Sequence, residues 1–279
     1  MKLAFSTLAC PEWTFEQILD AAKQYGYQGI EFRGLQEELD LPNVPEFAPS
    51  RIAETREKLE AAGIQAACLS SSIAVVALAS AQIDQHAAVT HARRYIELAK
   101  EVGAPYIRLF CGEIPPTVLR DTALERASDM LRRIGDYAQE NHVVATVETH
   151  DHFVRTDELM TLVHLTNHPA VQVLWDIHHP YRFAGETIDQ SMRELDGHVR
   201  YTHVKDSVLN MDTDGYTYVP VGDGDVPLRE AITALTAAGY DGYYTLEWEK
   251  RWIPALAGPE TVLPQYVEQM QAWGEATGG

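Results

Sequence analysis

The sequence predicts an α/β fold, a (β/α)8 TIM barrel formed by a single domain of residues 1–279. Three observations support this prediction. Short apolar segments alternate with longer amphipathic segments along the chain, several helical segments end at a glycine just before the next strand, and metal-ligand side chains stand at the ends of four successive strands. Such alternation is typical of parallel strands joined by helices. The length of 279 residues, 46% of them hydrophobic, suits one barrel of about 250 residues.

The strands are predicted at short, nearly continuous apolar runs, because strands that are buried on both faces have this pattern. They lie near residues 2–6, 29–33, 64–70, 105–111, 143–148, 171–176, 199–204 and 243–247. Helices are predicted between them and after the last, near 14–25, 50–62, 84–101, 117–140, 157–166, 186–196, 227–238 and 261–273. A doubly wound open sheet is the alternative, but no Gly-x-Gly-x-x-Gly motif follows the first strand.

The ends of the helices carry recognisable signals. Thr14 can cap the first helix, with Gln17 three residues further on. Glycine can close a helix in the left-handed conformation before a short turn, and it stands at this position four times, at Gly26, Gly63, Gly103 and Gly239. Asn141 is predicted to do the same before the strand near 143–148. The longest irregular pieces, 34–49 and 206–226, both follow strands, on the face where barrels build their active sites.

Composition excludes several classes of protein. With 41 acidic and 22 basic residues, the net charge of −19 would repel a phosphodiester backbone, so a small or neutral substrate is favoured over nucleic acid. No apolar run reaches the roughly 18 residues of a membrane span, and Ser6 and Thr7 break the short apolar start that could pass for a signal peptide. Cys10, Cys68 and Cys111 are an odd number without paired metal spacing, which indicates reduced thiols in the cytoplasm.

Four side chains that can bind metal fall at the tips of strands five to eight. They are Glu148, Asp176, His203 and Glu247. A single carboxylate at a strand end often only caps the next helix. Three carboxylates and an imidazole at the same depth would instead repel one another strongly without a cation, so this set predicts one bound divalent metal. Its oxygen-rich ligands suit Mn²⁺, Mg²⁺ or Co²⁺ better than a closed structural zinc site, although Zn²⁺ is possible.

Five further residues are predicted to contact a substrate: His179, Lys205, Arg108, Arg33 and Trp13. His179 can hold a substrate oxygen or support the metal ligands. Lys205 can reach the substrate or form an ion pair beside Asp206. The arginines can bind an anionic group, and Trp13 can form an apolar wall or simply pack. The loop Gly222-Asp223-Gly224-Asp225 stands where barrels often bind phosphate, but its two acids favour an unphosphorylated substrate.

The chain resembles the xylose isomerase-like TIM-barrel superfamily. The resemblance rests on Glu148, Asp176-x-x-His179, His203-Val204-Lys205-Asp206 and Leu246-Glu247-Trp248-Glu249, and it covers essentially the whole chain. This superfamily includes sugar phosphate isomerases and epimerases, ketose 3-epimerases, inosose dehydratases and endonuclease IV. In the epimerase branch the resemblance implies that the metal ligands are Glu148, Asp176, His203 and Glu247, and that Glu148 and Glu247 also form the acid/base pair.

The predicted function is a metal-dependent sugar isomerase or epimerase that acts through an enediolate on a ketose or related polyol. A dehydratase acting on an inosose or a keto acid at the same metal site is the alternative. An endonuclease IV-like nuclease would need additional His ligands from strands three and four, which end in Cys68-Leu69-Ser70-Ser71 and Phe110-Cys111-Gly112. A non-catalytic sugar-binding barrel would not need the two acid/base carboxylates. The expected partners are a sugar or polyol and, for a homo-oligomer, further copies of the chain, with no nucleic acid or membrane.

Overall fold

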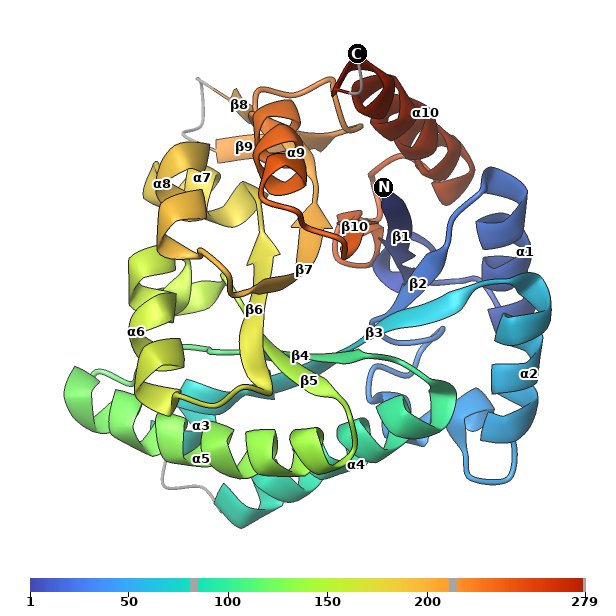
Figure 1. Ribbon diagram of the computed structural model, residues 1–279. Coiled ribbons are helices and arrows are strands. Elements are labelled where there is room, and N and C mark those ends of the chain that lie inside the picture. Colours follow the sequence, from blue (N-terminus) through green and yellow to red (C-terminus); the bar gives the residue numbers. More distant parts are fainter. Residues whose placement is uncertain (81–84, 211–214, 278–279) are drawn as a thin grey trace.

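The computed structural model describes residues 1–80, 85–210 and 215–277, and its strands close into the predicted barrel (Figure 1). The eight barrel strands follow in chain order: β1 Lys2–Ser6, β2 Gly29–Phe32, β3 Gln65–Ala74, β4 Tyr106–Phe110, β5 Val144–Glu148, β6 Val171–Asp176, β7 Val199–Val204 and β10 Tyr243–Leu246. Neighbouring strands are parallel, and β10 pairs with both β7 and β1 to close the ring. The predicted fold class is therefore confirmed.

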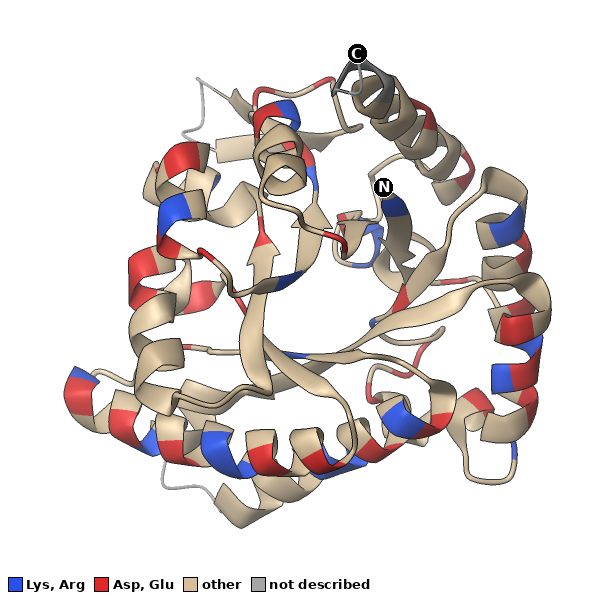
Figure 2. Ribbon diagram, in the orientation of Figure 1, with Lys and Arg blue, Asp and Glu red and all other residues tan. Residues whose placement is uncertain are grey.

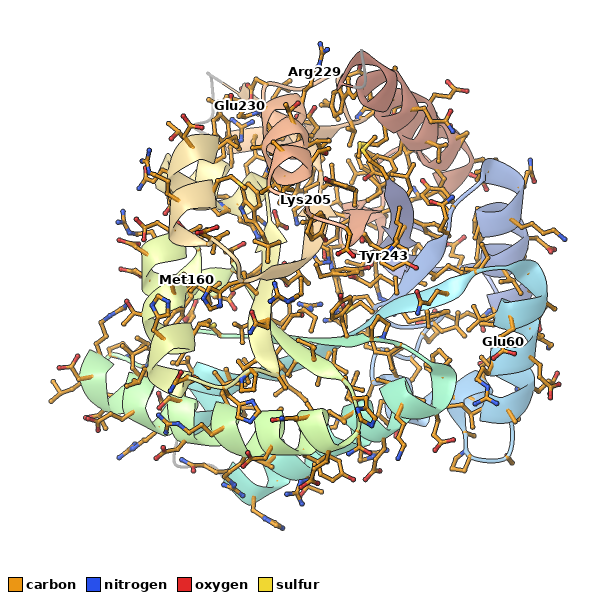
Figure 3. The ribbon with its side chains drawn as sticks, in the orientation of Figure 1. Glu60, Met160, Lys205, Arg229, Glu230 and Tyr243 are labelled. Carbon is orange, nitrogen blue, oxygen red and sulfur yellow. The ribbon has the colours of Figure 1, made fainter. Side chains whose placement is uncertain are left out.

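Helices surround this ring of strands (Figure 1). They are α1 Phe15–Tyr25, α2 Ile52–Ala62, α3 Val75–Ser80, α4 Gln85–Val102, α5 Arg120–Glu140, α6 Thr156–Thr166, α7 His178–Ala184, α8 Ile188–Glu194, α9 Leu228–Ala237 and α10 Pro259–Thr277. Charged residues recur along the outer helices, whereas most residues of the barrel strands are uncharged (Figure 2). Side chains fill the interior of the ring, so the barrel has a packed core (Figure 3).

The capping predictions hold with one exception. Thr14 and Gln17 form the expected capping box at the start of α1. The four predicted glycines all have positive φ, between 70° and 82°. Asn141 does not, because its φ is −101°. The left-handed position falls one residue later, on His142 with φ 58°, so the prediction for Asn141 is wrong.

Gly29 shows how closely the inner layer of the barrel is packed. A Cβ atom added at Gly29 would lie 2.6 Å from Cε1 of Tyr243 and 2.9 Å from Cβ of Ala67. Tyr243, labelled in Figure 3, is fixed by its hydroxyl, which donates to Oε1 of Gln65 at 2.7 Å. A larger residue at the start of β2 would therefore collide with Tyr243 and Ala67, so glycine is required there.

Three features were not predicted. The segment after β7 contains an antiparallel hairpin of β8 Asp206–Asn210 and β9 Gly215–Val219, although residues 211–214 of the expected irregular piece lie outside the described residues. A short helix, α7, begins directly after β6. Strand β3 continues to Ala74 and is followed by α3, with a shift of register between Ser70 and Ala74. These short additions lie within the βα loops, where sequence periodicity is weak.

The remaining sequence predictions concern the cysteines and the membrane. Cys10, Cys68 and Cys111 are free and buried, as expected of reduced thiols. Among the described residues, no helix combines the length and the apolar character needed to cross a bilayer. Residue 84, the expected start of the predicted helix near 84–101, lies outside the described residues.

Candidate metal centre

The structure brings the four predicted ligands together at the carboxyl end of the barrel. Glu148 and Asp176 are the last residues of β5 and β6, His203 lies in β7, and Glu247 directly follows β10. Because β5, β6, β7 and β10 are consecutive in the sheet, their tips are neighbours in space. All four side chains are buried, and each offers one donor atom within 4.8 Å of the others.

His203 lies at the middle of this group. Its Nδ1 is 3.3 Å from Oε1 of Glu148, 3.3 Å from Oε2 of Glu247 and 3.9 Å from Oδ2 of Asp176. Three carboxylate oxygens and one imidazole nitrogen thus surround a common point. This donor set is the kind that binds Mn²⁺, Mg²⁺ or Co²⁺.

The two oxygens of Asp176 have different roles. Oδ1 accepts hydrogen bonds from the backbone N–H groups of His178 at 2.9 Å and His179 at 3.1 Å, so it caps the start of α7. Oδ2 accepts no hydrogen bond of good geometry among the described residues, although Nζ of Lys205 is 2.8 Å away. A buried carboxylate oxygen without a proper donor fits a metal ligand.

The pKa values of the three buried carboxylates depend on positive charges that the chain itself places beside them. Burial and the nearby Glu247 and Glu148 carboxylates raise the pKa of Asp176 to about 6, although the ammonium of Lys205 acts in the opposite direction. Burial alone would raise the pKa of Glu148 too, but Arg108 and His203 lower it to about 2. Burial likewise opposes ionisation of Glu247, whose pKa is nevertheless held well below its ordinary value by His203 and Lys205. The ionised carboxylates are therefore stabilised mainly by neighbouring positive charge.

A further carboxylate, Glu31 of β2, orients the imidazole of His203. Oε2 of Glu31 is 2.8 Å from Nε2 of His203, and both side chains are fully buried. A histidine that donates Nε2–H to a carboxylate presents Nδ1 to the metal, and such a partner fixes the tautomer and the orientation of the ring. Sequence reasoning missed Glu31, although a carboxylate within a short, apolar buried strand was a usable signal.

Two of the predicted substrate-binding cations contact the ligands directly. Arg108 of β4 donates Nη1–H to Oε2 of Glu148 at 3.0 Å, and its guanidinium lies 3.6 Å from the ring centroid of Phe110. Lys205, labelled beside β7 in Figure 3, forms ion pairs with Asp176, with Glu247 and, at 2.9 Å, with Glu249. Lys205 is thus ion-paired, but with the carboxylates of the centre instead of Asp206, and its contact with a substrate stays a prediction. Glu249 was quoted in the sequence motif but was given no role.

Asp206 instead organises the loop after the β8–β9 hairpin. Its Oδ2 accepts from the N–H groups of Gly222 at 2.9 Å and Gly224 at 3.0 Å. Its Oδ1 accepts from Ser207 at 2.9 Å and Val226 at 3.3 Å. A Cβ atom on Gly224 would lie 2.0 Å from Oδ1 of Asp206, so glycine is required there. The backbone amides of this loop, which stands where barrels often bind phosphate, therefore donate to a carboxylate of the chain itself.

The other three residues predicted to contact a substrate are His179, Arg33 and Trp13, and they have different surroundings. His179 is buried in α7, with Nδ1 3.1 Å from the carbonyl oxygen of Thr149. Donation from Nδ1 leaves Nε2 of His179 available. Arg33 follows β2 and donates Nη2–H to Oγ of Ser72 at 2.8 Å. Trp13 lines a cavity of about 530 Å³ together with Trp252 and Arg251, and none of the four predicted ligands lines that cavity. A substrate role for Trp13 stays a prediction.

Comparison with known proteins identifies the family. The family model described as xylose isomerase-like TIM barrel matches residues 19–273, so the chain belongs to this family. Two curated relatives are an inosose dehydratase from Geobacillus thermodenitrificans, 30% identical over 47% of this chain and 48% of the relative, and a fructoselysine 3-epimerase from Shigella flexneri, 26% identical over 54% and 55%. The chain therefore spans about half the length of the curated relatives that it matches.

Solved structures match over nearly the full chain. The probable 3-DHS dehydratase AsbF from Bacillus anthracis has a TM-score of 0.80, with 17% identity over 97% of this chain and 99% of its own. The D-psicose 3-epimerase from Clostridium cellulolyticum H10, solved with D-tagatose, also has a TM-score of 0.80, with 16% identity over 99% of both chains. A xylose isomerase-like TIM barrel protein from Mycobacterium smegmatis in complex with magnesium has a TM-score of 0.74, with 17% identity over 99% and 97%. At these identities the matches show a shared fold.

Proposed function

We propose that this protein is a divalent-metal-dependent enzyme that removes and returns a carbon-bound proton of a sugar-like substrate, as in sugar isomerisation or epimerisation. The observation that carries the proposal is the convergence of four buried donor atoms within 4.8 Å, including an Asp176 oxygen without a hydrogen-bond donor of good geometry. A divalent cation held by Glu148, Asp176, His203 and Glu247 would stabilise the negative charge of an enediolate.

The two glutamates have the roles of base and acid. Their pKa values are lowered, so both carboxylates are ionised at neutral pH and can accept a proton. Oε2 of Glu148 is held by Arg108, and Oε2 of Glu247 by Lys205, so each carboxylate has a fixed orientation. One ionised carboxylate would remove the proton from one face of the substrate, and the other, after it has taken up a proton from solvent, would return that proton to the opposite face.

The neighbouring groups would bind the substrate's oxygens. His179 is buried, with Nδ1 3.4 Å from Oδ2 of Asp176, and because Nδ1 donates to the carbonyl oxygen of Thr149, Nε2 is left to accept a hydrogen bond from a substrate hydroxyl.

The same centre can support dehydration, which is the loss of a β-hydroxyl group from the enediolate. This second candidate is favoured by the names of two similar proteins, an inosose dehydratase and a 3-DHS dehydratase.

We further propose that the protein is located in the cytoplasm, because all three cysteines are free and buried. The expectation that the chain forms a homo-oligomer stays a prediction.

The metal content provides the first test. Chelator-treated protein, reconstituted separately with Mn²⁺, Mg²⁺ and Co²⁺, should retain one ion per chain by elemental analysis, and each of the four ligand positions should be needed for this binding. Two or more tightly bound zinc ions per chain would contradict the proposal and favour the nuclease reading.

The fate of the substrate hydrogen provides the second test. Turnover of ketoses, inososes and keto acids in D₂O should place deuterium at the reacting carbon, because a carboxylate that holds the abstracted proton exchanges it with solvent. Full retention of protium at early conversion, observed by NMR, would instead indicate a direct hydride shift and would exclude the proposed role of Glu148 and Glu247. Formation of a deoxy or unsaturated carbonyl product distinguishes dehydration from epimerisation.

A further inference from the structure

Arg33 is a buried cation with no carboxylate partner among the residues that the structure describes. Arg33 is 6% exposed, and within the described residues its side chain makes one hydrogen bond, from Nη2 to the uncharged Oγ of Ser72. Nη1 is buried and has no hydrogen-bond partner in the described part of the chain. A buried guanidinium without a counter-ion is costly, so its presence beside the proposed metal centre points to an anion that arrives from outside.

Arg108 offers a second donor of the same kind. Its residue is 1% exposed, and although Nη1 is paired with Glu148, its Nε has no hydrogen-bond partner among the described residues. One face of its guanidinium is covered by the ring of Phe110. Arg33 and Arg108 therefore each retain a buried, unpaired N–H group.

The two guanidinium groups act on the same region beside the metal centre. Arg33 follows β2 and Arg108 lies on β4, and Ser72, which holds Arg33, belongs to the intervening strand β3. Burial and the positive charge of Arg108 lower the pKa of Arg33 to about 10, while the Glu247 and Glu31 carboxylates act in the opposite direction. The two cations are thus close enough to repel each other, and an anion between them would relieve that repulsion.

We infer that Arg33 and Arg108 bind a carboxylate of the substrate, so that the natural substrate is a polyhydroxy acid instead of a neutral sugar. This inference rests on the proposed function, because it places the acid's remaining oxygens at the proposed metal centre. Two unpaired N–H donors match the two oxygens of a carboxylate. A phosphate would require more donors, and two loop amides that could have bound it, those of Gly222 and Gly224, already donate to Asp206.

Binding to the Mn²⁺-loaded protein tests this inference without turnover. Isothermal titration should compare, for chains of four to six carbons, the aldonate, the alditol and the alditol phosphate of the same configuration. At least one aldonate should bind at least tenfold more tightly than its alditol and its alditol phosphate. Arg33→Gln should abolish this preference, and Arg33→Lys, which keeps the charge but loses the planar donor pair, should retain part of it.

Arg251→Gln is the matched control, because the guanidinium carbons of Arg33 and Arg251 lie 5.9 and 5.8 Å from the ring centroid of Trp252, but Arg251 donates to the carbonyl oxygen of Gln36. It should keep the full preference for aldonates. The inference is overturned if no aldonate binds more tightly than its alditol, if the preference survives in Arg33→Gln, or if the alditol phosphates bind best. Since binding is measured directly, these outcomes are independent of the isotope experiment, whose failure would overturn the proposed reaction alone.

Discussion

The two halves of the barrel contribute different chemistry to the same site. Strands β5, β6, β7 and β10 each place one predicted metal ligand at or directly beyond the strand end. Strands β2, β3 and β4 place none of these ligands, and instead supply Glu31, Ser72 and Arg108, which hold a ligand or a neighbouring cation. The second half thus forms the proposed metal site, whereas the first half orients it and carries the unpaired arginine donors. Mutations in the two halves should therefore have different consequences.

The largest expected effect is in the ligand half. Glu148→Gln and Glu247→Gln should each lower kcat by about 1000-fold or more, because each removes a proton-transfer group together with the negative charge of a ligand. Glu249→Gln is the matched control, since Glu249 also pairs with Lys205 but does not belong to the ligand group, and it should lose less than tenfold. Circular dichroism should confirm that all three variants are folded. Near-normal turnover in either of the first two variants would exclude that residue as acid or base.

A smaller effect is expected from Asp206, which holds the loop of the ligand half. Asp206→Asn should lower the free energy of unfolding by about 2 to 4 kcal/mol. The new amide NH₂ group replaces a carboxylate oxygen that accepts hydrogen bonds from backbone N–H groups, so donors would then face donors. Asp223→Asn, the same change at an exposed position of that loop, should be nearly neutral. Chemical denaturation gives both values, and equal stability of the two variants would show that the Asp206 contacts do not stabilise the fold.

A substitution of Glu31 tests whether the first half of the barrel affects the affinity of the centre for metal. Glu31→Gln keeps a hydrogen-bond acceptor for His203 but removes the charge, so the affinity for Mn²⁺ should fall about 10- to 100-fold. Glu186→Gln is a suitable control, because Glu186 is also buried and accepts hydrogen bonds from Thr156 and Ser191 on α6 and α8. Competition with a chelator measures both affinities. An unchanged affinity for Mn²⁺ in Glu31→Gln would mean that the charge of Glu31 is not needed to orient His203 for metal binding.

The same comparison explains what the sequence could and could not predict. The ligands Glu148, Asp176, His203 and Glu247 end recognisable apolar runs, so strand order alone was sufficient to bring them together. Glu31 lies inside its strand and meets a residue 172 positions away, a contact that depends on the twist and register of the closed barrel. The partners of Lys205 depend on side-chain reach across β6 and β10, and the β8–β9 hairpin arises in a segment whose tertiary contacts outweigh its weak local pattern. Local periodicity therefore predicts the strands, and closure of the sheet determines which charges meet.

The smallest effect concerns acid stability and the histidines next to the ligands. His178 is buried at the start of α7, with Nε2 2.9 Å from Oγ of Ser207 and with no partner for Nδ1 among the described residues. Burial, together with the positive charges of Lys205 and Arg182, lowers the pKa of His178 to about 2. Because this value lies below the unfolded value of about 6.5, the neutral imidazole contributes stability that is fully present above pH 6.5 and is lost as the pH falls below it.

In chelator-treated protein, the free energy of unfolding attributable to His178 should fall by about 1.4 kcal/mol between pH 7.5 and pH 5.5, since the unfolded chain gains a proton that the folded chain does not bind. His178→Asn removes the titrating group, so this variant should lose correspondingly less stability than the wild type over that interval. His142→Asn, at an exposed position before β5, should retain the wild-type slope. Urea denaturation at a series of pH values measures all three slopes. If His178→Asn and the wild type show the same slope, His178 is protonated in the folded protein, and the acid sensitivity of the ligand half must come from its carboxylates and His203.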